Sequence, residues 1–119
     1  MPHDDIARTL HRWTEATAAQ DADALAEVFH PAAVQVVVTP ERELVLTTAD
    51  YLDMLRAKRI GGHAAQVVVH SVEAAGAVAA ARVSRTTAKV RFDDAVSLLK
   101  VDGQWRVTGA AVTVTPLEG

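Results

Sequence analysis

The sequence predicts an α+β protein in which helices pack on one side of a curved antiparallel sheet. The chain starts with apolar residues that recur at helical spacing, and its second half reads as strands only. Two of those strands are separated by Asp102-Gly103. An Asp-Gly pair between apolar-rich runs is a strong hairpin signal, because both central residues of a type I′ turn need a positive φ.

Two helices are expected at the start, over Asp4–Ala19 and Asp21–Phe29. In the first, Ile6, Leu10 and Trp13 fall on one stripe, as the core-facing side of a helix requires. The aspartate that opens the second can cap it. The His-Pro pair that follows ends helical structure, since proline disfavours the α conformation in the residue before it.

Two short strands and a third helix follow. The strands are expected at Val34–Thr39 and Glu43–Leu46. Thr47–Asp50 supplies a cap and an acid for the helix, and Gly61-Gly62 stops it. Four strands joined by short turns then complete the chain: Gln66–Ala74, Val78–Thr87, Phe92–Val101 and Gln104–Thr115.

Composition limits the class of protein. The 119 residues suit a single domain, 1–119, of which 50% is hydrophobic and 23% charged. A net charge of −3 argues against a nucleic-acid partner, and the absence of cysteine excludes disulfides and thiolate chemistry. The start does not read as a signal peptide, and no apolar run is long enough to span a bilayer. We therefore expect a cytoplasmic protein.

Several segments in this order carry a family resemblance: Gln20-Asp21, Phe29-His30-Pro31-Ala32-Ala33, Val72–Val83 around Gly76 and, most closely, Asp94–Val107. On these residues the chain resembles the nuclear transport factor two-like superfamily, which includes SnoaL-like polyketide cyclases. Within that superfamily it is most similar to the putative lumazine-binding proteins. The resemblance implies a cone-shaped α+β fold with three N-terminal helices on the sheet.

The resemblance is specific for fold and weak for function, because the superfamily hosts isomerases, dehydratases, cyclases, epoxide hydrolases and binding domains. Ketosteroid isomerases carry an Asp-Pro pair after the first strand, whose aspartate is the general base. The corresponding pair here is Thr39-Pro40, and Trp13 stands on the first helix where those isomerases have a tyrosine. A steroid-isomerase mechanism is therefore not expected.

The closing hairpin supplies one candidate. A two-residue loop at Asp102-Gly103 pairs Leu98 with Val107 on the core-facing side. The same register places Asp94 on the inner face, opposite Ala111, where the small neighbour leaves room for a ligand.

The preceding hairpin supplies a second candidate. A two-residue loop at Ala75-Gly76 puts His70 on the inner face and Arg82 on the outer one. A three-residue loop would instead place Arg82 beside Val68, since a slip of one residue reverses the faces. In the first register His70 and Asp94 form a candidate catalytic acid–base pair.

Each candidate also has a structural interpretation. A lone histidine among valines suits a satisfied core or interface position, and an aspartate can cap a strand end. Candidate ligand-binding residues of the pocket are Trp13, Tyr51, Gln66, Val96 and Val107. The scattered histidines lack the spacing of a metal site, and neither a metal nor a cofactor is expected.

Two functions remain open. The first is a small-molecule binding protein with an apolar, cone-shaped pocket. The alternative is a SnoaL-like cyclase, isomerase or dehydratase that uses His70 and Asp94 on an apolar cyclic substrate. A homodimer is expected through an apolar outer sheet face, predicted to contain Val67, Val69, Ala80, Ala95 and Val112.

Overall fold

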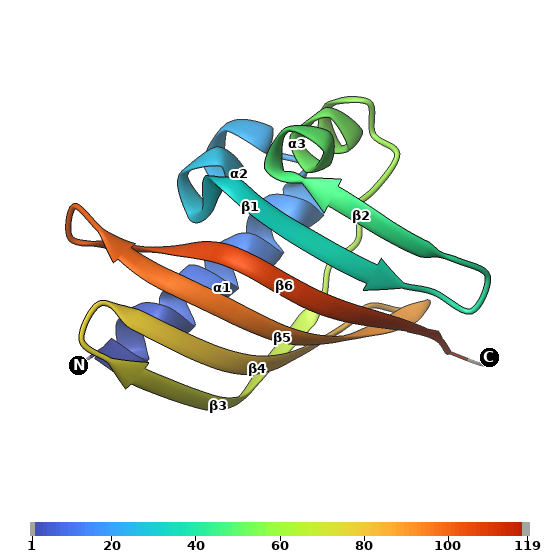
Figure 1. Ribbon diagram of the computed structural model, residues 1–119. Coiled ribbons are helices and arrows are strands. Elements are labelled where there is room, and N and C mark those ends of the chain that lie inside the picture. Colours follow the sequence, from blue (N-terminus) through green and yellow to red (C-terminus); the bar gives the residue numbers. More distant parts are fainter. Residues whose placement is uncertain (1, 118–119) are drawn as a thin grey trace.

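The computed structural model describes residues 2–117, within which it contains three helices and six strands (Figure 1). In chain order the elements are α1 (Pro2–Ala19), α2 (Ala22–Val28), β1 (Phe29–Val38), β2 (Glu43–Thr47), α3 (Thr48–Arg56), β3 (Gln66–Ala75), β4 (Val78–Thr86), β5 (Val90–Val101) and β6 (Gln104–Pro116). The predicted order of elements and the α+β class are confirmed.

The strands form one sheet in the order β2-β1-β6-β5-β4-β3. Neighbouring strands run antiparallel except β1 and β6, which run parallel. The sheet is therefore mostly antiparallel, as predicted, with one parallel pair that joins the first half of the chain to the second.

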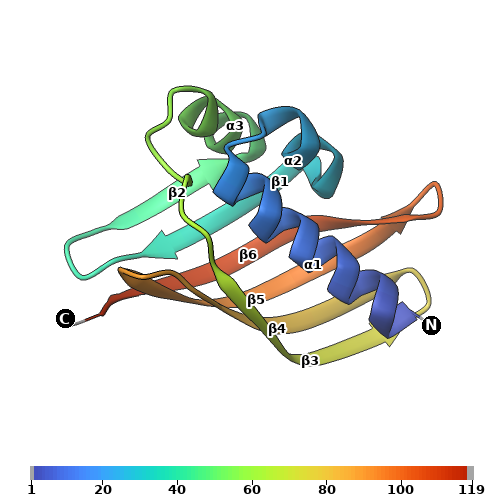
Figure 2. The same ribbon diagram turned by 180° about the vertical axis from the view of Figure 1, so that it is seen from behind.

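The helices cover one face of the sheet and leave the other bare (Figure 2). We call the covered face the inner face and the bare one the outer face. Helix α1 lies across the sheet and contacts β3 and β6, whereas α3 contacts β1 and β2. The expected caps are present: Asp21 accepts a hydrogen bond from the Ala24 amide, and Thr47 and Asp50 form a capping box.

The core lies between the helices and the inner face. Its largest fully buried side chains are Trp13, Phe29, Ile6, Leu10, Leu25, Leu55, Leu98 and Val107. Phe29 stands edge-on to Trp13, with ring centroids 5.2 Å apart, and stacks on Tyr51 at 5.5 Å. These aromatic contacts fix the junction of α1, α3 and the start of β1, next to the cavity described below.

The predicted hairpin between β5 and β6 is confirmed. Asp102 and Gly103 have φ values of 50° and 80°, as a type I′ turn requires, and Val101 pairs with Gln104. The register then shifts, because Ser97 pairs with Gly109 while Leu98 pairs with Val107. The extra residue on β6 is a β-bulge.

This bulge corrects one expected pairing. Asp94 lies on the inner face as predicted, but it pairs with Val112 rather than with Ala111. A bulge adds one residue to one strand. The residues of β6 that face inward are therefore odd-numbered before Thr108 and even-numbered after it.

A second bulge, in β3, corrects the position of His70. The turn lies at Gly76-Ala77, with Val72 paired to Ala81 on the inner face. Simple alternation from Val72 would keep His70 inside, but the register shifts between Val69 and Ser71. Val69 takes the inner position and His70 is exposed on the outer face. The expectation that His70 faces the interior is wrong.

The bulges also change which residues lie on the outer face. Ala80 and Ala95 are exposed there, as expected, but Val67, Val69 and Val112 belong to the inner face and pack on the core. The exposed valines of the outer face are Val34, Val36, Val38, Val45, Val68 and Val78.

Within residues 2–117 no helix has the length and apolar character needed to cross a membrane. The cytoplasmic compartment stays a prediction.

Candidate functional site

A cavity of about 380 Å³ lies between the inner face of the sheet and the helices. Its apolar wall includes Val37, Leu46, Met54, Ile60, Phe92 and Val114, which come from both halves of the chain. The volume is near the lower end of the ~300–1,000 Å³ typical of ligand pockets. A cavity of this size and character suits a small ring system.

The loop between α3 and β3 closes one side of the cavity by docking on the end of α1. The Gly62 amide donates to the Thr17 carbonyl at 3.1 Å, and Gln20 Nε2 donates to the Ile60 carbonyl at 3.0 Å. Gly61 has a φ of +76°, and a Cβ there would lie 2.2 Å from the Thr17 carbonyl oxygen. Glycine is therefore required for this close approach.

A buried ion pair places a charged residue, Arg85, in the cavity wall. Arg85 on β4 donates from Nε to Asp94 Oδ2 at 2.6 Å and from Nη2 to Oδ1 at 3.0 Å. The two side chains are 7% and 0% exposed. The guanidinium carbon lies 4.3 Å from the Trp13 ring centroid and 4.4 Å from that of Phe92. Two aromatic rings and a two-point ion pair thus hold the guanidinium in place.

This pairing determines what Asp94 can do. Both carboxylate oxygens of Asp94 are engaged by the Arg85 guanidinium, so a ligand would have to displace Arg85 to reach them. Arg85 lines the cavity, whereas Asp94 does not. The ion pair occupies Nε and one Nη2 hydrogen and leaves Nη1 without an acceptor in the part of the chain that the structure describes. The wall therefore offers the cavity a donor rather than a base.

Gln35 is a second polar residue of the cavity wall. It lies on β1, is 3% exposed and lines the cavity. Its Nε2 is buried and finds no hydrogen-bond partner within residues 2–117. Leaving a buried amide donor unpaired costs about 1–3 kcal/mol. Because Gln35 lines the cavity, rotation of its amide can present Nε2 to an acceptor on a ligand.

A short hydrogen-bond chain joins α1 to α3 beside the cavity. Trp13 Nε1 donates to the Tyr51 hydroxyl at 3.1 Å, and that hydroxyl lies 2.9 Å from Thr17 Oγ1. Tyr51 and Thr17 line the cavity. These hydrogen bonds fix the Trp13 ring, and that ring contacts the Arg85 guanidinium. They therefore help to position the guanidinium.

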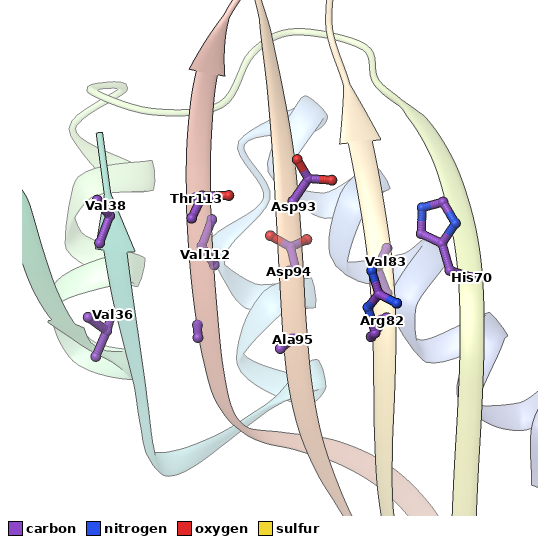
Figure 3. Close-up of a pocket in the computed structure, with 11 residues that line it drawn as sticks. Val36, Val38, His70, Arg82, Val83, Asp93, Asp94, Ala95, Val112 and Thr113 are labelled. Atoms are coloured by element: carbon purple, nitrogen blue, oxygen red, sulfur yellow. The ribbon is translucent and has the colours of Figure 1, made fainter. Parts of the chain in front are cut away.

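The outer face carries a separate polar cluster, of which His70 and Asp93 line a shallow depression of about 350 Å³ (Figure 3). His70 Nε2 lies 2.7 Å from Ser84 Oγ, and Ser84 donates to Asp93 Oδ1 at 2.9 Å. Arg91 donates to Ser84 at 3.0 Å and pairs with Asp93 at 3.1 Å. A serine hydroxyl has one proton, and here it goes to the carboxylate. His70 therefore does not act on Ser84 as a base.

Asp93 is the titratable group that this cluster perturbs. Hydrogen bonds from Arg91 and then from Ser84 lower its pKa below the usual 3.8, because both favour the charged carboxylate. The cluster is thus an outer-face ion pair supported by a serine and a histidine.

The structure does not bring His70 and Asp94 together. His70 is on the outer face with Ser84, and Asp94 is on the inner face with Arg85. Both residues border the outer-face depression (Figure 3), but the Asp94 side chain is 0% exposed and is bonded to Arg85 rather than to His70, so the acid–base pair expected from the sequence is not assembled.

Of the residues predicted to line the pocket, some line the cavity and others lie elsewhere. Tyr51 lines the cavity, while Trp13 is fully buried and contacts Arg85. Gln66 is exposed at the start of β3 and does not line the cavity. Val96 and Val107 are buried in the core, outside the cavity lining.

Sequence reasoning missed two buried polar residues of the cavity wall, Arg85 and Gln35. A signal for Arg85 existed, because the small or apolar inward residues Ala79, Ala81 and Val83 continue at period two to position 85. Gln35 likewise alternates with valines in β1. Neither alternation by itself tells which face of the strand is covered by helices, because that depends on the pairing with neighbouring strands.

A family model described as "Putative lumazine-binding" matches residues 2–111. The chain belongs to this family. The comparison with curated proteins gives no match.

Solved structures share the fold at low identity. An NTF2-like protein of unknown function from Silicibacter pomeroyi is 20% identical, with a TM-score of 0.84 and 94% of each chain covered. One from Shewanella baltica is 20% identical, with a TM-score of 0.83, 98% of this chain covered and 95% of the other. A ketosteroid isomerase-like protein from Erwinia carotovora atroseptica is 12% identical, with a TM-score of 0.73 and coverages of 98% and 96%. The fold is therefore the nuclear transport factor two-like α+β fold.

Proposed function

We propose that this protein binds a small, mostly apolar ring molecule in the inner cavity. The observation that carries the proposal is a mostly apolar cavity of about 380 Å³ whose wall contains the buried polar side chains of Arg85 and Gln35. A few polar groups converging on an apolar pocket are typical of small-molecule sites. The family description points to lumazine, a planar bicyclic compound, as one candidate.

The composition of the lining favours binding over acid–base catalysis. Among the described residues, no carboxylate lines the cavity, and the histidine that does, His63, is exposed. General acid–base catalysis needs a proton acceptor within reach of the substrate. The buried polar groups serve recognition better, because Arg85 and Gln35 can donate hydrogen bonds.

The proposal is tested by native mass spectrometry of the purified protein, followed by titration with lumazine. Tryptophan fluorescence can report binding in a Trp105→Phe variant, in which the remaining tryptophan, Trp13, contacts the cavity residue Arg85. We expect a bound small molecule in the native spectrum, or saturable binding of lumazine or of another bicyclic compound.

Two variants of neighbouring valines on β1 localise the binding. Val37 lines the cavity, whereas Val38 points to the outer face and is 43% exposed. Val37→Phe fills the cavity and should abolish binding, while Val38→Phe should leave it intact. A protein that is empty as purified and binds no bicyclic compound contradicts the proposal.

We further propose that a second copy of the chain covers the outer face. Val34, Val36, Val38 and Val45 are 37–60% exposed there, on the adjacent strands β1 and β2, and no helix covers them (Figure 1). A bare apolar sheet face is suited to packing on an identical face about a twofold axis.

The oligomeric state tests this second proposal. Light scattering during size-exclusion chromatography should give twice the chain mass of 12.7 kDa. Val36→Lys should shift the mass toward that of one chain, because it places a charge in the apolar patch. A native mass of a single chain at micromolar concentration contradicts the dimer.

A further inference from the structure

We infer that the ligand of the inner cavity carries a neutral carbonyl group, of ketone, amide or imide type, at the end that faces Arg85 and Gln35. The inference rests on the proposed binding function and specifies its ligand class. Three observations support it: an incompletely used guanidinium, an unpaired buried amide and a neutralised ion pair.

Arg85 and Gln35 supply hydrogen-bond donors that need an acceptor. Arg85 uses Nε and Nη2 on Asp94, which leaves its Nη1 hydrogens free for a ligand. Gln35 Nε2 is buried without a partner, and its side chain is 3% exposed in the wall of the same cavity. Carbonyl oxygens accept hydrogen bonds from both kinds of donor, directly or after the Gln35 amide has rotated.

The charge balance favours a neutral acceptor over a carboxylate. Arg85 is positive, but Asp94 compensates its charge through the two-point contact. A ligand carboxylate beside Arg85 would bring an unbalanced negative charge next to an ion pair that is already neutral, with a large desolvation cost. The other cation of the lining, Lys89, is exposed in the turn before β5, where water solvates its charge. A carbonyl satisfies the donors without that cost.

Three bicyclic probes with one ring skeleton test the inference: tetralin, 1-tetralone and tetralin-1-carboxylate. They differ at one ring carbon, which bears no acceptor, a neutral carbonyl oxygen or an appended carboxylate, the last tested as each enantiomer. Calorimetric or Trp13 fluorescence titrations should show 1-tetralone bound about tenfold more tightly than tetralin, and more tightly than the carboxylate.

Two substitutions assign the preference to its residues. Gln35→Leu should weaken 1-tetralone about fivefold and leave tetralin unchanged. Gln104→Leu, an exposed position at the β5–β6 turn, is the matched control and should change neither. The double variant Arg85→Met/Asp94→Leu replaces the ion pair with apolar side chains, a change that folded proteins tolerate. It should remove the remaining preference for the ketone.

The outcomes separate the inference from the function on which it rests. If none of the probes binds, the proposed binding function fails for this class of molecule and the inference fails with it. If tetralin binds as tightly as 1-tetralone, or the carboxylate binds most tightly, the cavity is a binding site but the carbonyl inference is overturned. If the double variant does not fold, an unchanged ketone preference in Gln35→Leu still overturns the assignment to Gln35.

Discussion

Arg85 and Asp94 show how one contact between side chains decides the chemistry of the cavity. An aspartate on the inner face of a cone would serve as a base if it were alone. Here it is fully buried and bound at two points by Arg85, whose guanidinium also contacts Trp13 and Phe92. The cavity therefore meets the cation of the pair, and the carboxylate is a positioning group for it.

Breaking the pair should be costly. Asp94→Asn removes the charge that compensates buried Arg85 and should lower the free energy of unfolding by about 3–5 kcal/mol. Asp93→Asn is the neighbouring control, because Asp93 pairs with Arg91 at the surface and its side chain is 46% exposed. That variant should lose less than about 1 kcal/mol. Urea unfolding measures both, and equal losses would show that the Arg85–Asp94 pair is not a buried charge pair.

The unpaired amide of Gln35 gives a prediction of opposite sign. Gln35→Leu removes a buried donor without a partner and keeps a similar shape, so it should raise the free energy of unfolding of the ligand-free protein by about 1–3 kcal/mol. Thermal and urea unfolding measure the change. A clear loss of stability would mean that Gln35 makes a structural hydrogen bond in solution.

Asp93 gives a prediction about pH. Its pKa is lowered from 3.8 by hydrogen bonds from Arg91 and Ser84, so it contributes stability above the unfolded-state value. That contribution is lost as the pH falls through the lower folded-state pKa. The stability difference between the wild type and Asp93→Asn should thus be largest near neutrality and shrink below about pH 4. Urea unfolding across this range tests it, and a difference that is constant with pH would contradict it.

At the scale of elements, the loop after α3 depends on a glycine more than the β5–β6 turn does. Gly61 and Gly103 both have positive φ, but only Gly61 has a backbone oxygen 2.2 Å from the position of an added Cβ. Gly103→Ala should cost about 1 kcal/mol, from backbone strain alone. Gly61→Ala should cost clearly more and disturb the cavity wall. Equal losses in urea unfolding would show that the loop does not dock on α1 as described.

Two bulges mark the limit of what the sequence predicts about the strands. The order of the elements, the caps and the Asp102-Gly103 turn follow from local patterns, and the structure has them. The bulges at His70 and Thr108 do not follow from local patterns. Each inserts one extra residue into a strand whose residues alternate between the two faces on both sides of the insertion. His70 was assigned to the wrong face for this reason, while Asp94 kept its face on the unbulged strand β5.

At the scale of the whole molecule, the two faces of the sheet have different roles. The inner face and the helices enclose the cavity. The outer face exposes valines and the His70 cluster, of which Val36, Val38, His70 and Asp93 are drawn in Figure 3. The sequence predicted an apolar container of this fold and one of its inner wall residues, Tyr51. It did not predict that Arg85 and Gln35 converge on the cavity from β4 and β1, since that depends on contacts between distant strands.

The central claim is that the inner cavity is the ligand site. An NMR titration of the isotope-labelled protein with 1-tetralone tests it most directly, because each backbone amide reports its own position. We predict saturable shifts at Gln35, Gly61, Gly62 and Arg85, with the outer-face amides of Ala80 and Ala95 unchanged. Shifts confined to the outer face, or none at saturating probe, would contradict the claim.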